Sequence, residues 1–260
     1  MKCYKKNIPV VVAALFIQTA LAAQEGSTQA DNATSLELER IGVNSILPER
    51  LESVPGSYTV VDEKELEARR PFSIKEALAG VPGLNVLQNE DPLGLAQNIG
   101  LRGMDPRRTA RTLLLEDGMP LFLAPYGDPS SHYIPMLDRV QRIEVVKGSG
   151  QVLYGPQTVG GMINFVTRPI PKDGVHGSVS GMLGNNDFNS LYANIGAGGE
   201  LGGVMLDATR KTGDGIRKNH DFEVVDVTLK GQLNINDQHT LKGKVGYYKE
   251  DSHVSETGLG

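Results

Sequence analysis

The chain has 260 residues, of which 26 are Lys or Arg and 31 are Asp or Glu, so its formal net charge is −5. An acidic balance of this kind argues against nucleic acid as a partner, because the phosphate backbone attracts basic surfaces.

The N-terminus has the layout of a secretory signal peptide. Three lysines precede an apolar core, IPVVVAALFIQTALA, which ends in small residues and is too short and wrongly flanked for a membrane-spanning helix. The alternative, a buried N-terminal helix, is disfavoured by those lysines. We expect residues 1–22 to be removed together with the only cysteine, Cys3, so no disulfide or thiolate chemistry is expected in the mature chain. That chain keeps 23 basic and 31 acidic residues, a formal charge of −8.

Residues 23–50 are predicted to be an exposed arm. QEGSTQADNATS is polar, small and without hydrophobic periodicity, which is typical of a segment that cannot form a core. One piece, LELERIGV at residues 36–43, has a more structured pattern.

Residues 51–170 carry closely spaced helix, strand and turn signals. SYTVV predicts a strand, Asp62 is expected to cap a helix, and Ser73 with Glu76 predicts a capping box for a second helix, IKEALAG. ARTLLLEDGMPLF predicts a hairpin whose turn is Asp117-Gly118. The other predicted strands are LNVLQ, NIGLRG, RIEVVKG and GMINFVTR. Together these elements indicate one α+β domain, large enough to bury a core of its own.

Residues 171–260 change to an alternating pattern. In VDVTLKGQLNI every second residue from Val225 to Ile235 is apolar or glycine, while polar residues fall on the other face. About five such segments, each about ten residues long, fit tilted strands that cross a bilayer. An ordinary antiparallel sheet with one wet face fits the alternation equally well. Because the pattern is still running at Gly260, we expect the sequence to be the N-terminal part of a longer protein.

The glycine-rich stretch before the last strand of the α+β domain does not match a catalytic loop. No Lys-Ser or Lys-Thr pair follows its glycines, which excludes a phosphate-binding P-loop, and KGSGQ lacks the spacing of a nucleophile elbow. The five histidines are scattered, with none paired at metal-ligand spacing. The adjacent carboxylates Glu116 and Asp117 lie at the hairpin turn, where Asp serves turn geometry. No enzyme is therefore predicted.

Four stretches together resemble the TonB-dependent outer-membrane receptors. They are IKEALAGVPGLNV, NIGLRGMDPRR, LLLEDGMPL and RIEVVKGSGQVLYGPQTVGGMINFVTR. The resemblance implies a plug domain at residues 51–170, inside the lumen of an antiparallel transmembrane β-barrel of about 22 strands when complete. Residues 171–260 would then supply roughly the first five strands, in the outer membrane of a Gram-negative bacterium. APYGDP and YGPQTVGGMINFVTR are most similar to the ferric citrate receptor branch.

For function, the resemblance implies import of a ferric chelate, either ferric citrate or another siderophore, into the periplasm. Iron would arrive already chelated, so neither a cofactor nor a metal site of the protein's own is expected. Ferric chelates carry negative charge, which calls for guanidinium, hydroxyl and amide donors at the top of the plug. The candidate ligand-binding residues are Arg108, Thr109, Arg111, Tyr126 and Gln157. Packing and loop bracing are the alternative roles of Tyr126 and Gln157.

A plug that fills a lumen and can still be displaced needs a polar, hydrogen-bonded surface rather than an apolar one. The expected plug–barrel contacts are Arg102, Arg139, Arg142, Lys147 and Arg168. A solvated charged face is the alternative for each of them.

Active uptake across a membrane without ATP needs an external energy source, which in this family is TonB with its inner-membrane energising complex. TonB would bind the arm by strand addition, in which the arm pairs as an extra strand with a sheet of TonB. The candidate TonB box is Leu36, Glu37, Leu38, Glu39, Arg40, Ile41, Gly42 and Val43, with a simple linker as the alternative. The expected partners are therefore TonB, the ferric chelate and outer-membrane lipid. A second hypothesis is a secreted or periplasmic binding module without a transport role.

Overall fold

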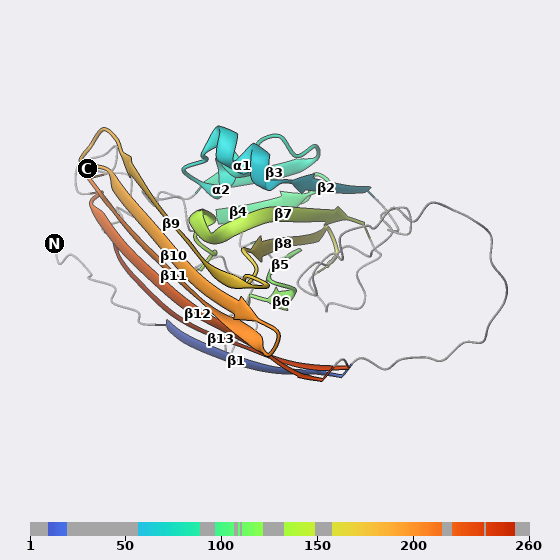
Figure 1. The fold of residues 1–260 in the computed structure, drawn as a ribbon. Helices are drawn as coiled ribbons and strands as arrows, with labels where there is room; N and C mark the ends of the chain where they lie inside the picture. The colour runs from blue at the N-terminus through green and yellow to red at the C-terminus, as the bar shows by residue number, and fades with distance from the viewer. Residues whose placement is uncertain are drawn as a thin grey trace, which may run out of the picture.

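A computed structural model of the chain describes residues 10–19, 57–88, 97–106, 109, 111–121, 133–148, 158–214, 220–236 and 238–252. The described residues form a curved six-stranded sheet, here called the wall, and a smaller α+β domain over residues 57–168, here called the plug (Figure 1). The plug lies against the concave face of the wall. This arrangement confirms the predicted fold class, an α+β domain followed by the antiparallel strands of a partial barrel.

The plug is built on a mixed five-stranded sheet. In spatial order its strands are β2 (Ser57–Val61), β7 (Val140–Lys147), β8 (Gly161–Thr167), β5 (Thr112–Glu116) and β6 (Met119–Pro120). β5 and β8 pair in parallel, and the other neighbours pair antiparallel. β3 (Leu84–Gln88) and β4 (Gln97–Leu101) form a separate antiparallel pair. All of these strands lie where the sequence predicts strands, within a few residues.

Two short helices, α1 (Glu63–Arg69) and α2 (Ile74–Ala77), follow β2. Asp62 caps α1 as predicted, since its carboxylate accepts from the Glu65 N–H at 2.8 Å. Ser73 caps α2 at 3.3 Å, but the Glu76 carboxylate accepts from the N–H of Phe72 rather than that of Ser73. The reciprocal half of the predicted capping box is therefore displaced by one residue. No helix in the described part of the chain is long and apolar enough to cross a membrane.

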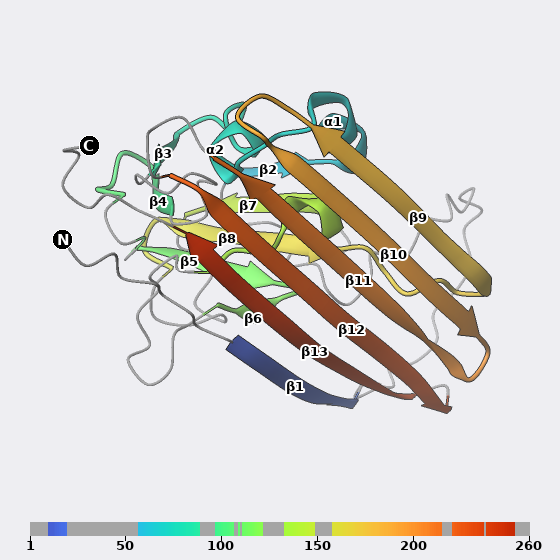
Figure 2. The ribbon, with the colours of Figure 1, turned by 90° about the vertical axis from the view of Figure 1, so that its left-hand side faces the viewer.

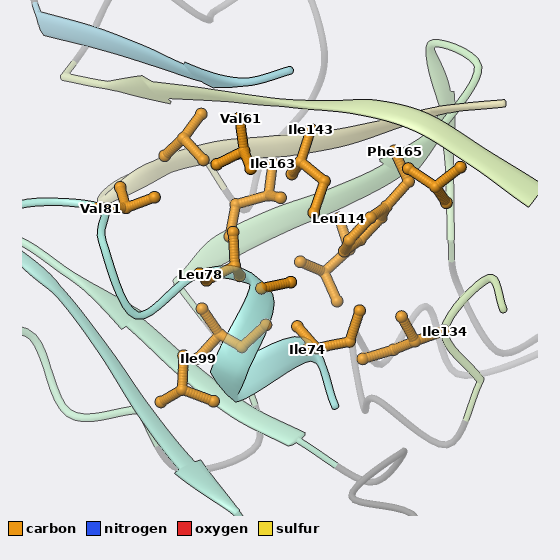
Figure 3. Packing of buried hydrophobic residues seen from close by; sticks show 14 of the residues in the cluster. Val61, Ile74, Leu78, Val81, Ile99, Leu114, Ile134, Ile143, Ile163 and Phe165 are labelled. Carbon is orange, nitrogen blue, oxygen red and sulfur yellow. The ribbon is translucent and has the colours of Figure 1, made fainter. Parts of the chain in front are cut away.

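The plug core lies between the five-stranded sheet and α2 (Figure 3). The side chains labelled in Figure 3 come from α2, from strands and from the segments that connect them: Val61, Ile74, Leu78, Val81, Ile99, Leu114, Ile134, Ile143, Ile163 and Phe165. Backbones pass close to one another beside this core, because a Cβ on Gly161 would lie 2.2 Å from the carbonyl oxygen of Val146. Gly161 also has φ 142, so both space and backbone conformation require glycine where β8 begins.

The wall strands follow one another along the chain as antiparallel neighbours (Figure 2). They are β9 (Gly174–Leu183), β10 (Asn189–Gly199), β11 (Gly202–Gly213), β12 (Phe222–Asn236) and β13 (His239–Ser252). The segment that leaves the plug crosses β10 so closely that a Cβ on Gly198 would lie 1.8 Å from the Pro171 carbonyl oxygen. The plug and the wall are therefore joined by a short connection that is itself packed on the wall.

A sixth strand, β1 (Val10–Thr19), pairs antiparallel with β13, from Val10 opposite Tyr248 to Thr19 opposite His239. These residues belong to the expected signal peptide, so the pairing describes the uncleaved chain. Cleavage at the end of that peptide stays a prediction, and it would remove β1 from the wall.

The wall buries its polar face and exposes its apolar face. Along β12, Asp226 and Lys230 are 2% and 8% exposed, whereas Leu229 and Leu233 are 51% and 50% exposed. In a soluble sheet with one solvent-exposed face, the apolar side chains are buried and the polar ones are exposed, which is the opposite arrangement. Of the two interpretations that the sequence leaves open, the observed polarity favours a barrel wall with lipid outside and a polar plug inside.

The polarity of the wall predicts a depth-dependent cost for an added charge. Val225 lies in one register row with Arg210 and Lys249, at the border of the apolar band, while Leu229 lies inside the band. Leu229→Lys is expected to lower the free energy of unfolding of the full-length protein in lipid vesicles by about 2–4 kcal/mol, and Val225→Lys by about 0–1 kcal/mol. Urea titration of the folded fraction measures both values. Equal costs at the two positions would contradict a lipid-facing band.

Candidate functional site at the plug–wall interface

Six charged side chains meet where the plug touches the wall, and we call them the ionic cluster. The plug contributes Glu116, Asp117 and Arg139, and the wall contributes Asp226, Lys230 and Lys244. Glu116 ends β5, and Asp117 and Gly118 have φ 51 and 79, as the two central residues of a type I′ turn require. The tight turn therefore projects two adjacent carboxylates toward the wall.

Arg139 is the centre of the ionic cluster. It ends a 3₁₀ turn (Leu137–Arg139) and is 1% exposed. Its guanidinium donates to the Glu116 carboxylate, to the Tyr133 hydroxyl and, at 3.4 Å, to Asp226 on β12. A buried guanidinium requires such partners, because an unpaired buried charge is strongly destabilising. Arg139 thus joins a plug carboxylate to a wall carboxylate.

Asp117 joins three separate parts of the molecule. Its carboxylate accepts from the Thr167 N–H at 2.8 Å and from the Thr167 hydroxyl at 2.7 Å, at the end of β8. It also accepts from Lys244 Nζ on β13 at 3.1 Å, while Lys230 Nζ donates to the Thr167 hydroxyl at 2.8 Å and to the Arg168 carbonyl. The hairpin turn, the last plug strand and two wall strands are therefore fixed by one connected network.

The electrostatic environment keeps both turn carboxylates ionised. Burial raises the pKa of Glu116, but attraction by Arg139 and Lys244 outweighs this effect and lowers the pKa below its ordinary value. Burial likewise raises the pKa of Asp117, and Lys244, Lys230 and the Thr167 hydrogen bonds bring it below its ordinary value. Burial and the neighbouring Glu116 hold the pKa of Tyr133 well above its usual range, so its hydroxyl stays a donor.

A second set of polar contacts lies beside the ionic cluster. Arg168, the last residue before the connection to the wall, donates to the Tyr192 hydroxyl at 3.3 Å and lies 5.6 Å from the centre of that ring. Tyr192 in turn donates to Asp207 at 2.7 Å. Lys211 on β11 forms an ion pair with the plug residue Asp138 at 2.6 Å.

An apolar cluster also bridges the plug and the wall. The Phe72 ring packs edge-on against Phe188, with centroids 5.0 Å apart, and Tyr133 packs similarly against Tyr248 at 5.2 Å. Phe72 and Tyr133 belong to the plug, and their partners lie on or beside the wall strands. The plug surface is therefore mixed, whereas the sequence predicts a polar one.

The five predicted plug–barrel contacts fall into three groups. Arg139 and Arg168 contact wall residues, as described above. Arg142 and Lys147 instead bond inside the plug, to Glu144 at 2.9 Å and Thr59 at 3.3 Å, because their strand runs within the plug sheet. Arg102 is exposed in a left-handed turn with φ 58. The described contacts of Arg142 and Lys147 therefore lie within the plug, and their expected contact with the barrel stays a prediction.

The structure describes two of the five candidate ligand-binding residues. Thr109 is fully buried, and its hydroxyl accepts from the Ile99 N–H at 3.2 Å, so it braces its loop rather than facing a ligand. Arg111 has an exposed side chain, and its carbonyl accepts from the Gly160 N–H. Arg108, Tyr126, Gln157 and the candidate TonB box at residues 36–43 lie outside the described residues.

From the sequence, the adjacent carboxylates at the hairpin turn are predicted to serve turn geometry alone. Asp226, Lys230 and Lys244 are not predicted as contacts of the plug. Two signals could have found them: the carboxylate pair at a predicted tight turn, and charged residues on one face of otherwise apolar strands. Among the described residues, no three His, Cys, Asp or Glu side chains converge as a metal site requires.

Several known proteins are similar to this chain in sequence or in structure. Residues 50–162 match the family model of the TonB-dependent receptor plug domain. The vitamin B12 transporter BtuB of Photobacterium profundum is 28% identical over 229 residues, which cover 87% of this chain and 35% of that protein. The ferric enterobactin receptor PirA of Pseudomonas aeruginosa is 26% identical over 216 residues, covering 78% and 28%.

Among solved structures, the unliganded ferric citrate transporter FecA superposes with a TM-score of 0.66 at 32% identity, covering 76% of this chain and 32% of that one. The relatives are transporters and receptors rather than enzymes. This chain spans about a third of their length.

The buried position of Arg139 predicts a large effect of its removal. Arg139→Met leaves Glu116 and Asp226 without their guanidinium partner and is expected to weaken plug docking by about 3–5 kcal/mol. Arg69→Met is the matched control, because Arg69 pairs with Glu65 on an exposed helix face and should cost less than about 1 kcal/mol. Native-state proteolysis of the plug in the full-length protein measures both, and equal protection of the two variants would contradict a docking role.

The lowered pKa values of Glu116 and Asp117 predict loss of docking in acid. Both carboxylates have lower pKa values in the folded state than their ordinary values of 4.5 and 3.8, so their ionisation stabilises the docked plug at any pH above those ordinary values. This stabilisation is lost as the pH falls through the lowered values. Plug protection from proteolysis should therefore be constant from pH 7 to pH 5 and fall below about pH 4. Asp117→Asn should make this acid-dependent loss smaller. A loss centred near pH 6 would indicate other groups.

Proposed function

Because the chain belongs to the TonB-dependent receptors of the Gram-negative outer membrane, we propose that the whole protein imports a ferric chelate into the periplasm. The observation that carries this proposal is the buried ionic cluster between plug and wall. A permanent core would be apolar, whereas an interface held by ion pairs and hydrogen bonds keeps polar surfaces that water can solvate when the plug moves.

Ferric citrate or another ferric siderophore is the proposed substrate. The 32% identity to the ferric citrate transporter and the likeness to a ferric enterobactin receptor support an iron chelate. Iron would be carried inside its chelate, so the protein itself would bind neither metal nor cofactor. Arg111 is exposed and available for an anionic ligand, and Arg108, Tyr126 and Gln157 remain proposed donors.

TonB is the proposed source of energy. Residues 36–43 precede the plug, and strand addition to a partner sheet is an established way to recognise a peptide segment. Force applied there would reach the plug through β2, the first described plug strand, which pairs with β7 at the edge of the five-stranded sheet.

Deleting residues 36–43 from the full-length protein should abolish energised uptake of radiolabelled ferric citrate by cells while leaving binding of the chelate intact. Deletion of residues 24–31, the same length from the same arm, is the control and should leave uptake unchanged. The predicted loss follows because binding needs only the barrel and the top of the plug, whereas transport needs the connection to TonB.

Normal uptake after deletion of residues 36–43, with normal amounts of receptor in the membrane, would show that this segment is not the TonB box. Uptake of a vitamin B12 analogue in place of every ferric chelate tested would overturn the iron assignment, and this is the alternative that the likeness to BtuB supports. Binding without energised uptake of any substrate would favour the binding-module hypothesis.

A further inference from the structure

Two lysines of the ionic cluster face each other directly on the lumen side of the wall. Lys230 on β12 and Lys244 on β13 are register partners, and Lys242 lies two residues along the same face of β13. Like charges directly opposite one another in an antiparallel pair are destabilising. The wall therefore holds positive charge in an arrangement that is unfavourable without an anion beside it.

The plug supplies that anion. Lys244 contacts both turn carboxylates, Glu116 and Asp117, and Lys230 reaches Asp117 through the hydroxyl of Thr167. Of the acidic wall residues nearby, Asp226 pairs with Arg139, and Asp207 accepts from Tyr192 while also attracting Lys230 electrostatically without a hydrogen bond to it. The carboxylates in direct contact with Lys244 are thus those of the hairpin turn between β5 and β6.

We propose that Lys230 and Lys244 form an anion-binding site on the wall, which the Glu116–Asp117 turn occupies at rest and a carboxylate-bearing chelate occupies when the turn withdraws. This inference deepens the proposed import function and rests on it for the identity of the natural ligand. The turn resembles such a ligand chemically, because it presents two adjacent carboxylates on a short, rigid backbone segment.

The site couples two events that transport requires. Withdrawal of the turn leaves both ammonium groups without their plug carboxylates, so a passing polycarboxylate gains charge-assisted hydrogen bonds there. An anion already at the site opposes return of the turn, because both need the same donors. A bound chelate therefore keeps the turn displaced until the chelate leaves the site.

Calorimetric titration of the purified full-length protein in detergent with iron-free citrate tests the site. Glu116→Gln/Asp117→Asn removes both turn charges and should create a saturable citrate site that the wild type lacks. We expect affinity at least about tenfold above any wild-type citrate binding, weakening as salt is raised. Adding Lys230→Gln/Lys244→Gln to this variant should abolish the gain, and triethyl citrate, which is uncharged at these positions, should not bind.

Lys211→Gln is the matched control on the same background. Lys211 also pairs with a plug carboxylate, Asp138, but its register partner on β12 is Val224 rather than a second lysine. The gained citrate site should therefore survive this change. A folded Glu116→Gln/Asp117→Asn variant without citrate binding, or a gain insensitive to loss of both lysines, would overturn the proposal.

Asp117→Asn alone keeps the Glu116–Arg139 pair and replaces the double variant if that variant no longer docks its plug. It should show a smaller gain in citrate affinity at the same site. In cells, Lys230→Gln/Lys244→Gln with an unaltered plug should lower the maximal uptake rate severalfold without changing binding of the chelate at the surface. Unchanged uptake would count against the site. Citrate binding by the turn variant, together with no uptake of ferric citrate by cells that carry the wild type, would refute the import function and leave the anion site standing.

Discussion

Compensation of buried charge is the constraint on which the arrangement of plug and wall depends. Arg139 has almost no access to water, and its two carboxylate partners belong to different layers of the molecule. A buried ion pair adds little stability compared with apolar packing, but losing one partner is severe because the other charge stays buried. The contact is consequently all-or-none: it holds the plug in one position and has no favourable half-open state.

The same constraint explains the distribution of polar residues over three environments. The plug core is apolar, the plug–wall interface is largely charged and hydrogen-bonded, and the outer face of the wall is apolar again. Polar and apolar residues alternate along the wall strands. Because successive side chains point to opposite faces, this alternation places polar side chains toward the plug and apolar ones on the outer face. Aromatic contacts such as Phe72 on Phe188 supplement the polar interface without replacing it.

Local chemistry was readable from the sequence and long-range pairing was not. The Asp62 cap, the Asp117-Gly118 turn and the alternation after Val225 each depend on a few neighbouring residues, and each is present in the structure. A strand with alternating polar and apolar residues has the same sequence pattern whichever of its faces is buried. The position of the plug is what shows that the polar face of the wall is the buried one. Arg139 and Arg142 are three residues apart, yet one contacts the wall and the other its own sheet. Motifs resembling a known family identified the plug, but no local signal joins Asp117 to Lys244.

The parallel pairing of β5 with β8 and the contact between Glu116 and Lys244 together set an order of assembly. β8 lies between β7 and β5 in the plug sheet, and the two charged partners are 128 residues apart in the chain. Contacts of such high sequence separation form late, because the entropy of loop closure is lost before the contact can compensate it. The turn carboxylates precede their lysines in the chain, so they remain hydrated until β12 and β13 are in place. Formation of the interface is thus a dehydration step that waits for β12 and β13.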